Sequence, residues 1–218
     1  MTKPNVQNTT LNKQMTQRFD LTGKTGLITG SSGLLGYEHA AALLECNASV
    51  VLTDVCEVSL TETLGSLKDL FPKNKIETFI MDVTDMPSIL RVFDTIVSNN
   101  QKVDILINNA TVDPKVVGSR NVTNTSRLET FSTEDWDYQL AVGLTGAFNC
   151  CKVFGTAMAA GGQGGVILNI SSDLSVIAPD QRLYHDASVN DSLQQVKPVT
   201  YSVIKTGLIG LTRYIATY

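Results

Sequence analysis

Tyr201 and Lys205 are the two residues whose types and spacing most directly suggest chemistry. Residues four positions apart on a helix lie on one face, one turn from each other. An ammonium group at that distance favours the phenolate form of tyrosine, which makes the phenol a usable acid or base toward a hydroxyl or carbonyl. The same spacing also occurs where two side chains are simply solvated. The residues upstream must therefore decide between the two interpretations.

A glycine-rich segment near the N-terminus could bind a phosphate. Gly30, Gly33 and Gly36 stand between a predicted strand over 25–29 and a predicted helix over 34–46. Glycines at such a turn let the backbone approach a pyrophosphate, which rests on the N-terminus of the following helix. We expect the phosphate contacts at Gly30, Gly33 and the neighbouring residues Ser32, Leu34 and Leu35. An ordinary strand-to-helix turn is the alternative.

Asp54 follows the second predicted strand, over 49–53, and comes 18 residues after Gly36. A carboxylate at this place accepts hydrogen bonds from the hydroxyls of an adenosine ribose and repels a 2′-phosphate. The glycine segment contains no Lys or Arg, and none directly follows Asp54. The sequence therefore favours NAD over NADP, although a solvated aspartate at a strand end remains the alternative.

Three further groups follow predicted strands. Asp82 and Val83 come after the third strand, where a carboxylate can meet an adenine amino group or, alternatively, cap the next helix. Asn109 and Ala110 come after the fourth strand, where small hydrogen-bonding residues would lie against adenosine and tie neighbouring strands together. Ser172 comes after the fifth strand, where a hydroxyl beside the tyrosine could hold the substrate oxygen. Residues of these types are also common in ordinary turns.

The elements that must position these residues alternate along the chain. Strands are predicted over 25–29, 49–53, 75–81, 103–107 and 166–170. Helices are predicted over 34–46, 59–71, from residue 84 or 85 onward, from 132 to about 160, and over 200–211. This alternation predicts an α/β fold, a Rossmann-like doubly wound parallel sheet with helices on both faces. Ligands of such sheets bind beyond the carboxyl ends of the strands, where the candidate residues fall. We expect one domain over 21–218 after a polar lead-in over 1–20.

Composition narrows the class of protein. The net charge of −4 argues against nucleic acid or an anionic membrane as a partner. No apolar run approaches the ~20 residues of a membrane span, and the polar N-terminus lacks the apolar segment of a secretory signal. The 4 cysteines have no metal-site spacing, so we expect free thiols, no metal and a cytoplasmic protein.

Taken together and in order, these motifs resemble the short-chain dehydrogenase/reductase family. They read TGSSGLLG (29–36), Asp54, DV (82–83), NNA (108–110), ILNISS (167–172) and YSVIK (201–205). The resemblance implies a nicotinamide dinucleotide cofactor and an enzyme that acts on CH–OH groups. It makes Tyr201 the acid/base, Ser172 the group that polarises the reacting oxygen, and Lys205 the residue that favours the phenolate and binds the nicotinamide ribose. It also implies a homodimer or homotetramer.

The sequence departs from the family pattern in four ways. The middle glycine of the loop comes one position early, and Gly143 stands where the family has a helix asparagine that supports a proton-relay water. Ser172 and Tyr201 are 29 positions apart, which is longer than the family's usual spacing. The chain ends with the tyrosine helix, so the family's later strands are missing and we expect a C-terminally incomplete domain.

The polar segments at 111–131 and 173–199 bear on the substrate. Charged segments at the entrance of an active site suit a polyhydroxylated or phosphorylated small molecule. Alternatively, both segments could simply be solvated. The stretch from 171 to 218 resembles a bacterial subset of the family that modifies flagellin and surface glycans. We therefore expect an NAD-dependent oxidoreductase that interconverts a secondary alcohol and a ketone on a sugar-like or nucleotide-sugar substrate. The alternatives are a non-catalytic dinucleotide-binding regulator and an inactive, truncated chain.

Overall fold

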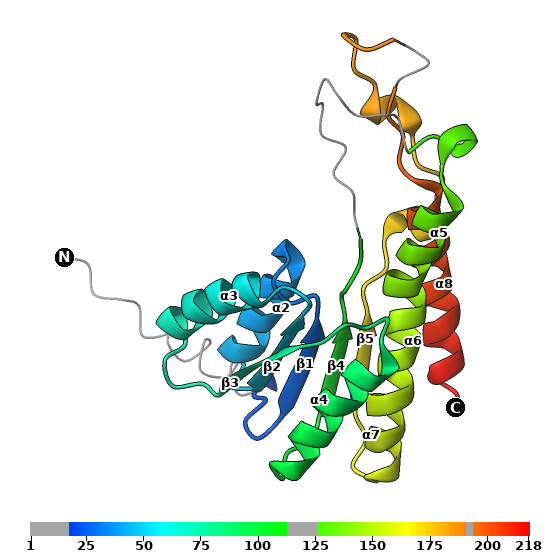
Figure 1. Cartoon of the computed structure of the whole chain (residues 1–218). Coiled ribbons are helices and arrows are strands. Elements are labelled where there is room, and N and C mark those ends of the chain that lie inside the picture. The colour runs from blue at the N-terminus through cyan, green and yellow to red at the C-terminus, as the bar shows by residue number, and fades with distance from the viewer. Residues whose placement is uncertain (1–17, 113–125, 191–193) are drawn as a thin grey trace, which may run out of the picture.

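A five-stranded parallel sheet forms the centre of the molecule (Figure 1). The structure, a computed structural model, describes residues 18–112, 126–190 and 194–218. The strand order is β3-β2-β1-β4-β5. The strands are β1 (Thr25–Thr29), β2 (Ser49–Asp54), β3 (Ile76–Ile80), β4 (Ile105–Asn108) and β5 (Val166–Asn169). The expected α/β, Rossmann-like fold is confirmed.

Helices connect the strands. They are α2 (Leu34–Glu45), α3 (Glu57–Leu70), α4 (Met86–Ser98), α5 (Thr133–Leu140), α6 (Gly146–Cys150), α7 (Thr156–Ala160) and α8 (Val199–Ile215). The π-helical stretches η2 (Ala141–Thr145) and η3 (Cys151–Gly155) join α5, α6 and α7 into one long helix. The short 3-10 segments are η1 (Leu128–Thr130), η4 (Asp173–Ser175) and η5 (Gln181–Tyr184).

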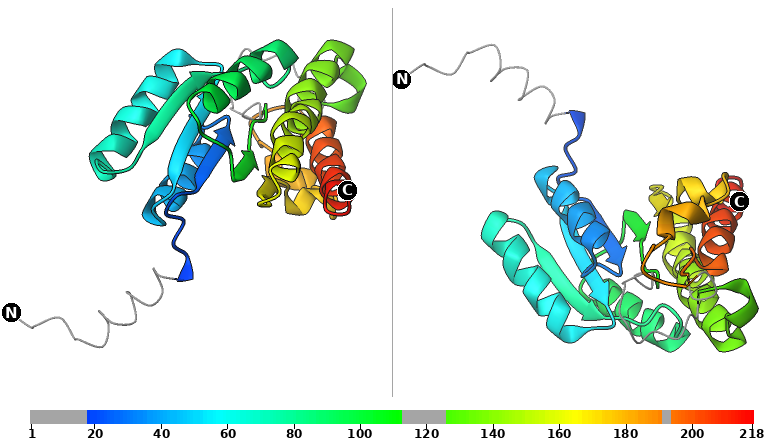
Figure 2. Two further views of the ribbon diagram at one scale, coloured as in Figure 1. Left: turned by 90° about the horizontal axis from the view of Figure 1, so that it is seen from below. Right: turned by 90° about the horizontal axis from the view of Figure 1, so that it is seen from above.

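The alternation of side chains along the central strands builds two separate cores. On one face Leu27, Val51 and Leu106 pack with buried residues of α4 and the long helix, including Phe154. On the other face Ile28, which is fully buried, packs with residues of α2 and α3. Figure 2 shows these helices on the two sides of the sheet. A strand buried on both faces reads as an apolar run without alternation, as TGLIT and SVVLT do.

Side-chain caps fix where two helices begin. The Asp85 carboxylate accepts a hydrogen bond from the Ser88 backbone N–H at 3.1 Å, which selects Asp85 over Thr84 as the cap of α4. The Ser132 hydroxyl accepts from the Asp135 N–H at 3.0 Å and begins the long helix. By length and composition that helix, 133–160, could cross a membrane. It instead packs Phe154 against the sheet, as the core helix of a globular domain does.

The residues of α2 that face the core are only partly the ones predicted from the sequence. From the sequence, Leu35, Ala42 and Leu43 of the helix predicted over 34–46 are available for packing. Leu43 does pack against the core and is partly buried, but Leu35 and Ala42 are exposed, and the fully buried residues are Gly36, Ala40 and Leu44. The turn before the helix sets this phase, because Gly36 packs against the backbone of residues 30 and 31. The first turn of α2 therefore leaves its leucines facing outward.

All 4 cysteines are free thiols. Burial raises the pKa of Cys150 to about 12 and that of Cys151 to about 11. These two thiols therefore stay protonated and serve as apolar core residues near neutral pH. Among the described residues, no group of three or more His, Cys, Asp or Glu side chains could hold a metal ion.

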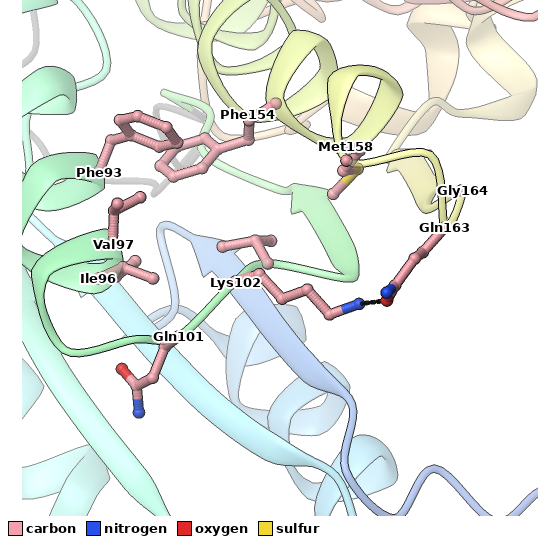
Figure 3. A pocket seen from close by; sticks show the side chains of 12 residues that line it. Phe93, Ile96, Val97, Gln101, Lys102, Phe154, Met158, Gln163 and Gly164 are labelled. Atoms are coloured by element: carbon pink, nitrogen blue, oxygen red, sulfur yellow. Dashed lines mark hydrogen bonds between the residues drawn. The ribbon is translucent and has the colours of Figure 1, made fainter.

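A cavity of about 320 Å³ lies between α4 and α7 (Figure 3). Its wall includes the edge-to-face ring pair Phe93 and Phe154, whose centroids are 5.9 Å apart, and Met158. Lys102 and Gln163 form a hydrogen bond at its rim. The segments at its rim precede β4 and β5, so this cavity lies at the amino end of the strands, away from the candidate residues.

Candidate active site

The glycine segment forms a tight turn at the carboxyl end of β1. Gly30 adopts a φ of +61°, and a Cβ there would lie 2.8 Å from the Ala110 Cα. A Cβ on Gly36 would lie 2.5 Å from the Gly30 carbonyl oxygen, so both positions require glycine. A Cβ on Gly33 would meet only that oxygen, at 3.5 Å, which is an ordinary contact. The described part of the protein therefore leaves room beside the Gly33 Cα, which a ligand could occupy.

The N-terminus of α2 is suited to an anion. Gly33 is the N-cap residue, and no side chain caps the first backbone N–H groups of this 12-residue helix. Leu34 and Leu35 occupy the first turn and are 83% and 53% exposed. Because both leucines lie on the surface, the backbone donors of this turn can be approached from solvent. These features fit the pyrophosphate of a dinucleotide.

Thr29 joins the ends of β1 and β4. Its hydroxyl oxygen accepts hydrogen bonds from the backbone N–H groups of Asn109 and Ala110, each at 3.0 Å. The Asn109 side-chain amide donates to the carbonyl oxygens of Thr29 at 3.1 Å and Gly30 at 2.9 Å. The predicted tie between neighbouring strands is confirmed, and it holds the glycine turn against the end of β4. Sequence reasoning did not assign this role to Thr29.

Asp54 ends β2 and contacts the glycine turn. One carboxylate oxygen, Oδ2, accepts from the Ser32 backbone N–H at 3.1 Å. The other, Oδ1, accepts from the N–H groups of Val55 at 2.8 Å and Cys56 at 3.3 Å. Three backbone donors thus fix the carboxylate beside the turn, where it keeps acceptor capacity for ribose hydroxyls. Sequence reasoning placed Asp54 at this edge of the sheet but did not predict its bond to the glycine turn.

Asp82 and Val83 have different local roles. The Asp82 carboxylate accepts from the backbone N–H and the hydroxyl of Thr84, at 2.8 and 2.7 Å. It therefore makes a local turn, and the capping alternative falls to Asp85. Val83 is buried against Gly146, and its carbonyl oxygen accepts from the Asn149 side chain at 3.3 Å. Both residues follow β3 at the carboxyl edge of the sheet.

Lys205 lies on α8 and reaches the end of β5. Its ammonium donates to the Ile170 carbonyl oxygen at 2.7 Å, and the residue is only 4% exposed. The Ser171 hydroxyl donates to the Lys205 carbonyl oxygen at 2.8 Å, which ties the segment after β5 to α8 from the other direction. Ile170, whose carbonyl holds the buried Lys205 ammonium, comes directly before Ser171 and two residues before Ser172. The ammonium is thus fixed beside the segment that carries both serines.

Tyr201 lies one turn before Lys205 on the same helix and is half-buried. The Lys205 ammonium nitrogen is 5.6 Å from the centroid of the tyrosine ring. A second ammonium, that of Lys197, lies 3.7 Å from the same centroid. The ring of the candidate acid/base thus has two cations near it. Sequence reasoning found only the one at i+4. Lys197 precedes Pro198, the N-cap of α8, so helical spacing does not place it over the ring.

Ser172 is the N-cap residue of η4 and comes three residues after the end of β5. Its hydroxyl donates to the Asp173 carboxylate at 2.8 Å and accepts from the Leu174 backbone N–H at 3.2 Å. Over the described ranges, no hydrogen bond joins Ser172 to the Tyr201 hydroxyl. η4 nevertheless packs on the tyrosine helix, because the Thr206 hydroxyl donates to the Ser175 carbonyl oxygen at 2.9 Å. Ser172 is therefore held beside α8 but engaged with its own turn.

Gly143 is buried where the long helix meets α8. A Cβ at this position would lie 2.8 Å from Ile204 Cγ2, so the Ile204 side chain occupies the space that an asparagine would need. On α8, Gly207 in turn faces a side chain of the long helix, because a Cβ on Gly207 would lie 2.9 Å from Leu144 Cδ2. The two glycines bring the helices into close contact. Glycine at 143, where the resemblance leads us to expect an asparagine, therefore provides close helix packing and no polar side chain.

The polar segment 173–199, which leads into α8, is the insert. Side-chain hydrogen bonds of Gln194 hold part of it together. The Gln194 side chain accepts from the Asp186 N–H at 2.8 Å and donates to the carbonyl oxygens of Asp186 at 2.7 Å and Val189 at 2.6 Å. The Val196 N–H donates to the Ser126 hydroxyl at 3.0 Å, which joins the insert to the segment before α5. In Figure 1 the insert rises at the carboxyl end of the strands, above α5 and α8.

A family model described as short chain dehydrogenase matches residues 24–188. This chain belongs to the short-chain dehydrogenase/reductase family. The match spans the glycine turn, Asp54, the NNA segment and Ser172. It agrees with the expectation drawn from the order of the motifs.

Several relatives in the family are similar along most of the chain. D-threitol dehydrogenase of Mycolicibacterium smegmatis is 27% identical over 198 residues, which are 91% of this chain and 65% of the relative. NAD-dependent glycerol dehydrogenase of Listeria innocua is 31% identical over 173 residues, which are 78% of this chain and 61% of the relative. The chain thus spans less than two thirds of the length of these two proteins.

A solved structure gives the same fold. It is gluconate 5-dehydrogenase of Burkholderia cenocepacia in complex with NADP and tartrate. The TM-score is 0.73 at 25% identity, and the alignment covers 93% of this chain and 68% of that one. One relative is named for NAD and this structure holds NADP, so the relatives support a nicotinamide dinucleotide without separating the two.

Proposed function

We propose that this protein is an NAD-dependent oxidoreductase that interconverts a secondary alcohol and a ketone on a small polyhydroxylated substrate. One observation carries the proposal. Tyr201 and the buried ammonium of Lys205 lie one turn apart on α8, and Lys205 is bonded to the end of the strand from which Ser172 follows. This brings an acid/base, a fixed cation and a hydroxyl to the same edge of the sheet as the glycine turn.

Each residue has a proposed task. Tyr201 gives a proton to the substrate oxygen or takes one from it, and Ser172 holds that oxygen. Lys205 favours the phenolate and binds the nicotinamide ribose. The glycine turn, with Gly30, Ser32, Gly33, Leu34 and Leu35, holds the pyrophosphate. Asp54 holds the adenosine ribose, and Asp82, Val83, Asn109 and Ala110 line the adenine side. When bound, the nicotinamide supplies hydride transfer.

Two observations support a polyhydroxylated substrate. The insert at the carboxyl edge is polar, with Arg182 paired to Asp180 and Asp186 bonded to Ser188. Relatives named for threitol and glycerol act on small polyols. We extend the proposal to sugar-like or nucleotide-sugar substrates of surface-glycan biosynthesis in the cytoplasm, on the resemblance of residues 171–218 to the flagellin- and glycan-modifying subset.

We also propose a homodimer or homotetramer built on the long helix and α8. Large apolar side chains on these helices face solvent, including Tyr138, Phe148, Val203 and Tyr214. Exposed aromatic side chains gathered on neighbouring helices are typical of subunit interfaces. Light scattering coupled to size exclusion measures the assembly, and a monomer at micromolar concentration would contradict this part of the proposal.

A screen of polyols, sugar alcohols and nucleotide-sugars with NAD and NADP tests the function directly. We expect NADH absorbance to rise with at least one neutral polyhydroxylated alcohol. If NAD raises the melting temperature but no substrate produces NADH, the protein is instead a dinucleotide-binding regulator. Gly143 is the observation that favours this second function, because the asparagine side chain of the family is absent there. Absence of both a cooperative melt and an NAD shift would indicate an inactive chain.

The Asp54→Asn variant tests the cofactor preference. The amide still accepts hydrogen bonds but loses the charge that strengthens those from ribose hydroxyls and repels a 2′-phosphate. Loss of a charge-assisted bond of about 1.5–3 kcal/mol corresponds to roughly 10–100-fold weaker NAD binding. We expect the ratio of kcat/KM for NAD to that for NADP to fall by about this factor. An unchanged ratio would remove Asp54 from the ribose site.

A further inference from the structure

Two lysines approach the ring of Tyr201, and only Lys205 is part of the function proposed above. Lys197 lies in the segment before α8, one turn from Tyr201 in sequence. Its ammonium nitrogen is 3.7 Å from the centroid of the tyrosine ring, against 5.6 Å for that of Lys205. A cation within about 6 Å of an aromatic centroid is attracted by the negative face of the ring. Of these two cations, Lys197 is thus the nearer to the ring.

Backbone hydrogen bonds at and next to Lys197 fix the position of this residue. The Lys197 N–H donates to the Gln181 side-chain oxygen at 2.9 Å, and the neighbouring Val196 N–H donates to the Ser126 hydroxyl at 3.0 Å. Pro198 follows, is buried and begins the helix. The insert and the segment before α5 therefore hold Lys197 from two sides. This anchoring gives the segment before α8 a role in placing Lys197.

We propose that Lys197 is a positioning residue for the acid/base: it holds the Tyr201 ring and, as a second cation, favours its phenolate. This inference rests on the proposed function, in which Tyr201 exchanges the substrate proton. The 3.7 Å distance is measured to the ring centroid, and a cation over the ring that carries the phenol favours the negatively charged form of that phenol. Removing the Lys197 charge therefore shifts proton exchange toward higher pH. Lys197 is half-buried, so water screens part of the effect.

Among the residues that the structure describes, the other charged groups around α8 are bonded to other partners or exposed. On η4, Asp173 is bonded to Ser172, and Lys205 on α8 itself is bonded to the end of β5. In the insert, Asp180 pairs with Arg182 and Asp186 bonds Ser188, with His185 beside it. Before α5, Arg127 pairs with Glu129. On α5, Glu134, Asp135 and Asp137 are exposed.

The first test measures kcat against pH for oxidation of a neutral polyol. We expect Lys197→Met to move the midpoint of the profile up by roughly half a unit to one unit. We expect Lys197→Arg, which keeps a cation that stacks on aromatic rings, to restore the wild-type midpoint. Lys68→Met, an exposed lysine on α3 at the opposite face of the sheet, changes the net charge equally and should move nothing. Lys197→Gln replaces the Met variant if the latter does not fold.

A second measurement does not depend on turnover. The chain has 6 tyrosines. Carbon-13 labelling of the phenol carbon, with the Tyr201→Phe spectrum for assignment, follows Tyr201 alone through a pH titration. An upward shift of its midpoint in Lys197→Met but not in Lys197→Arg supports the proposal. No shift in Lys197→Met overturns it, and so does a rise in KM confined to anionic sugar acids with an unchanged pH profile. If no substrate turns over, the proposed function fails and this titration still decides the role of Lys197.

Discussion

Tyr201→Phe is expected to abolish turnover, with kcat lower by roughly 10²–10⁴-fold, which is the usual contribution of a positioned acid/base. The variant removes only the hydroxyl. The ring remains half-buried on α8 between the segment that carries Lys197 and the turn that carries Lys205, so the fold should be retained. NAD affinity should stay within about twofold, because the phosphate turn and Asp54 lie on other elements. Initial rates and a fluorescence titration with NADH measure the two quantities.

Matched substitutions sharpen this result. Ser172→Ala should lower kcat less than Tyr201→Phe does, because a hydroxyl that holds an oxygen exchanges no proton. Lys205→Met should lower kcat and also weaken NAD binding, and it leaves the Ile170 carbonyl without its ammonium donor. Substantial turnover in Tyr201→Phe would show that another group exchanges the proton, and the assignment of Tyr201 as the acid/base would then be wrong.

Gly36→Ala is expected to destabilise the protein severely. Its Cβ would lie 2.5 Å from the Gly30 carbonyl oxygen and 2.6 Å from the Ser31 Cα, and both are backbone atoms of a turn with little freedom to move. Overpacking against a fixed backbone costs about 2–4 kcal/mol in the free energy of unfolding. For a chain of this size the melting temperature should fall by roughly 5–15 °C, as differential scanning calorimetry would measure.

Gly33→Ala is the matched control in the same turn. Gly33 has an ordinary φ of −79°, and its Cβ would make only a normal 3.5 Å contact with the Gly30 carbonyl oxygen. The melting temperature should therefore change little. NAD binding should weaken by about tenfold or more, because the methyl group fills space that we assign to the pyrophosphate. Equal losses of stability in both variants would contradict the steric account of Gly36, and unchanged NAD affinity in Gly33→Ala would move the pyrophosphate away from this residue.

Much of the fold could be predicted from local pattern. The run TGLIT gave β1 with the correct bounds, and SVVLT gave β2 to within one residue, because strands buried on both faces are short, apolar and flanked by turn residues. The parallel order followed from helices that alternate with strands. Once the sheet is parallel, Thr29, Asp54, Asp82, Asn108 and Ser172 must share one edge, whatever their side-chain contacts are.

Side-chain partners could not be predicted in this way. For Asp82 the sequence allowed an adenine contact or a helix cap. Asp85 is the cap of α4, and Asp82 makes a local turn with Thr84 that the sequence did not predict. The exposure of Leu35 depends on how the preceding turn sets the phase of α2, and a shift of one residue rotates a helix by about 100°. Helical periodicity alone does not fix that phase when apolar residues surround the helix, as they do in LLGYEHAAALL.

By itself, the sequence determined the class of fold, the edge at which chemistry can occur and the pairing of Tyr201 with Lys205, because each follows from periodicity and chain order. Only the tertiary structure decided that Ile204 fills the space at Gly143, that Thr29 fastens the NNA segment, and that a second ammonium, from Lys197, lies over the tyrosine ring. The physical reason is that these three contacts join segments or atoms whose distance depends on packing and on side-chain direction. Local spacing in the chain does not specify either one.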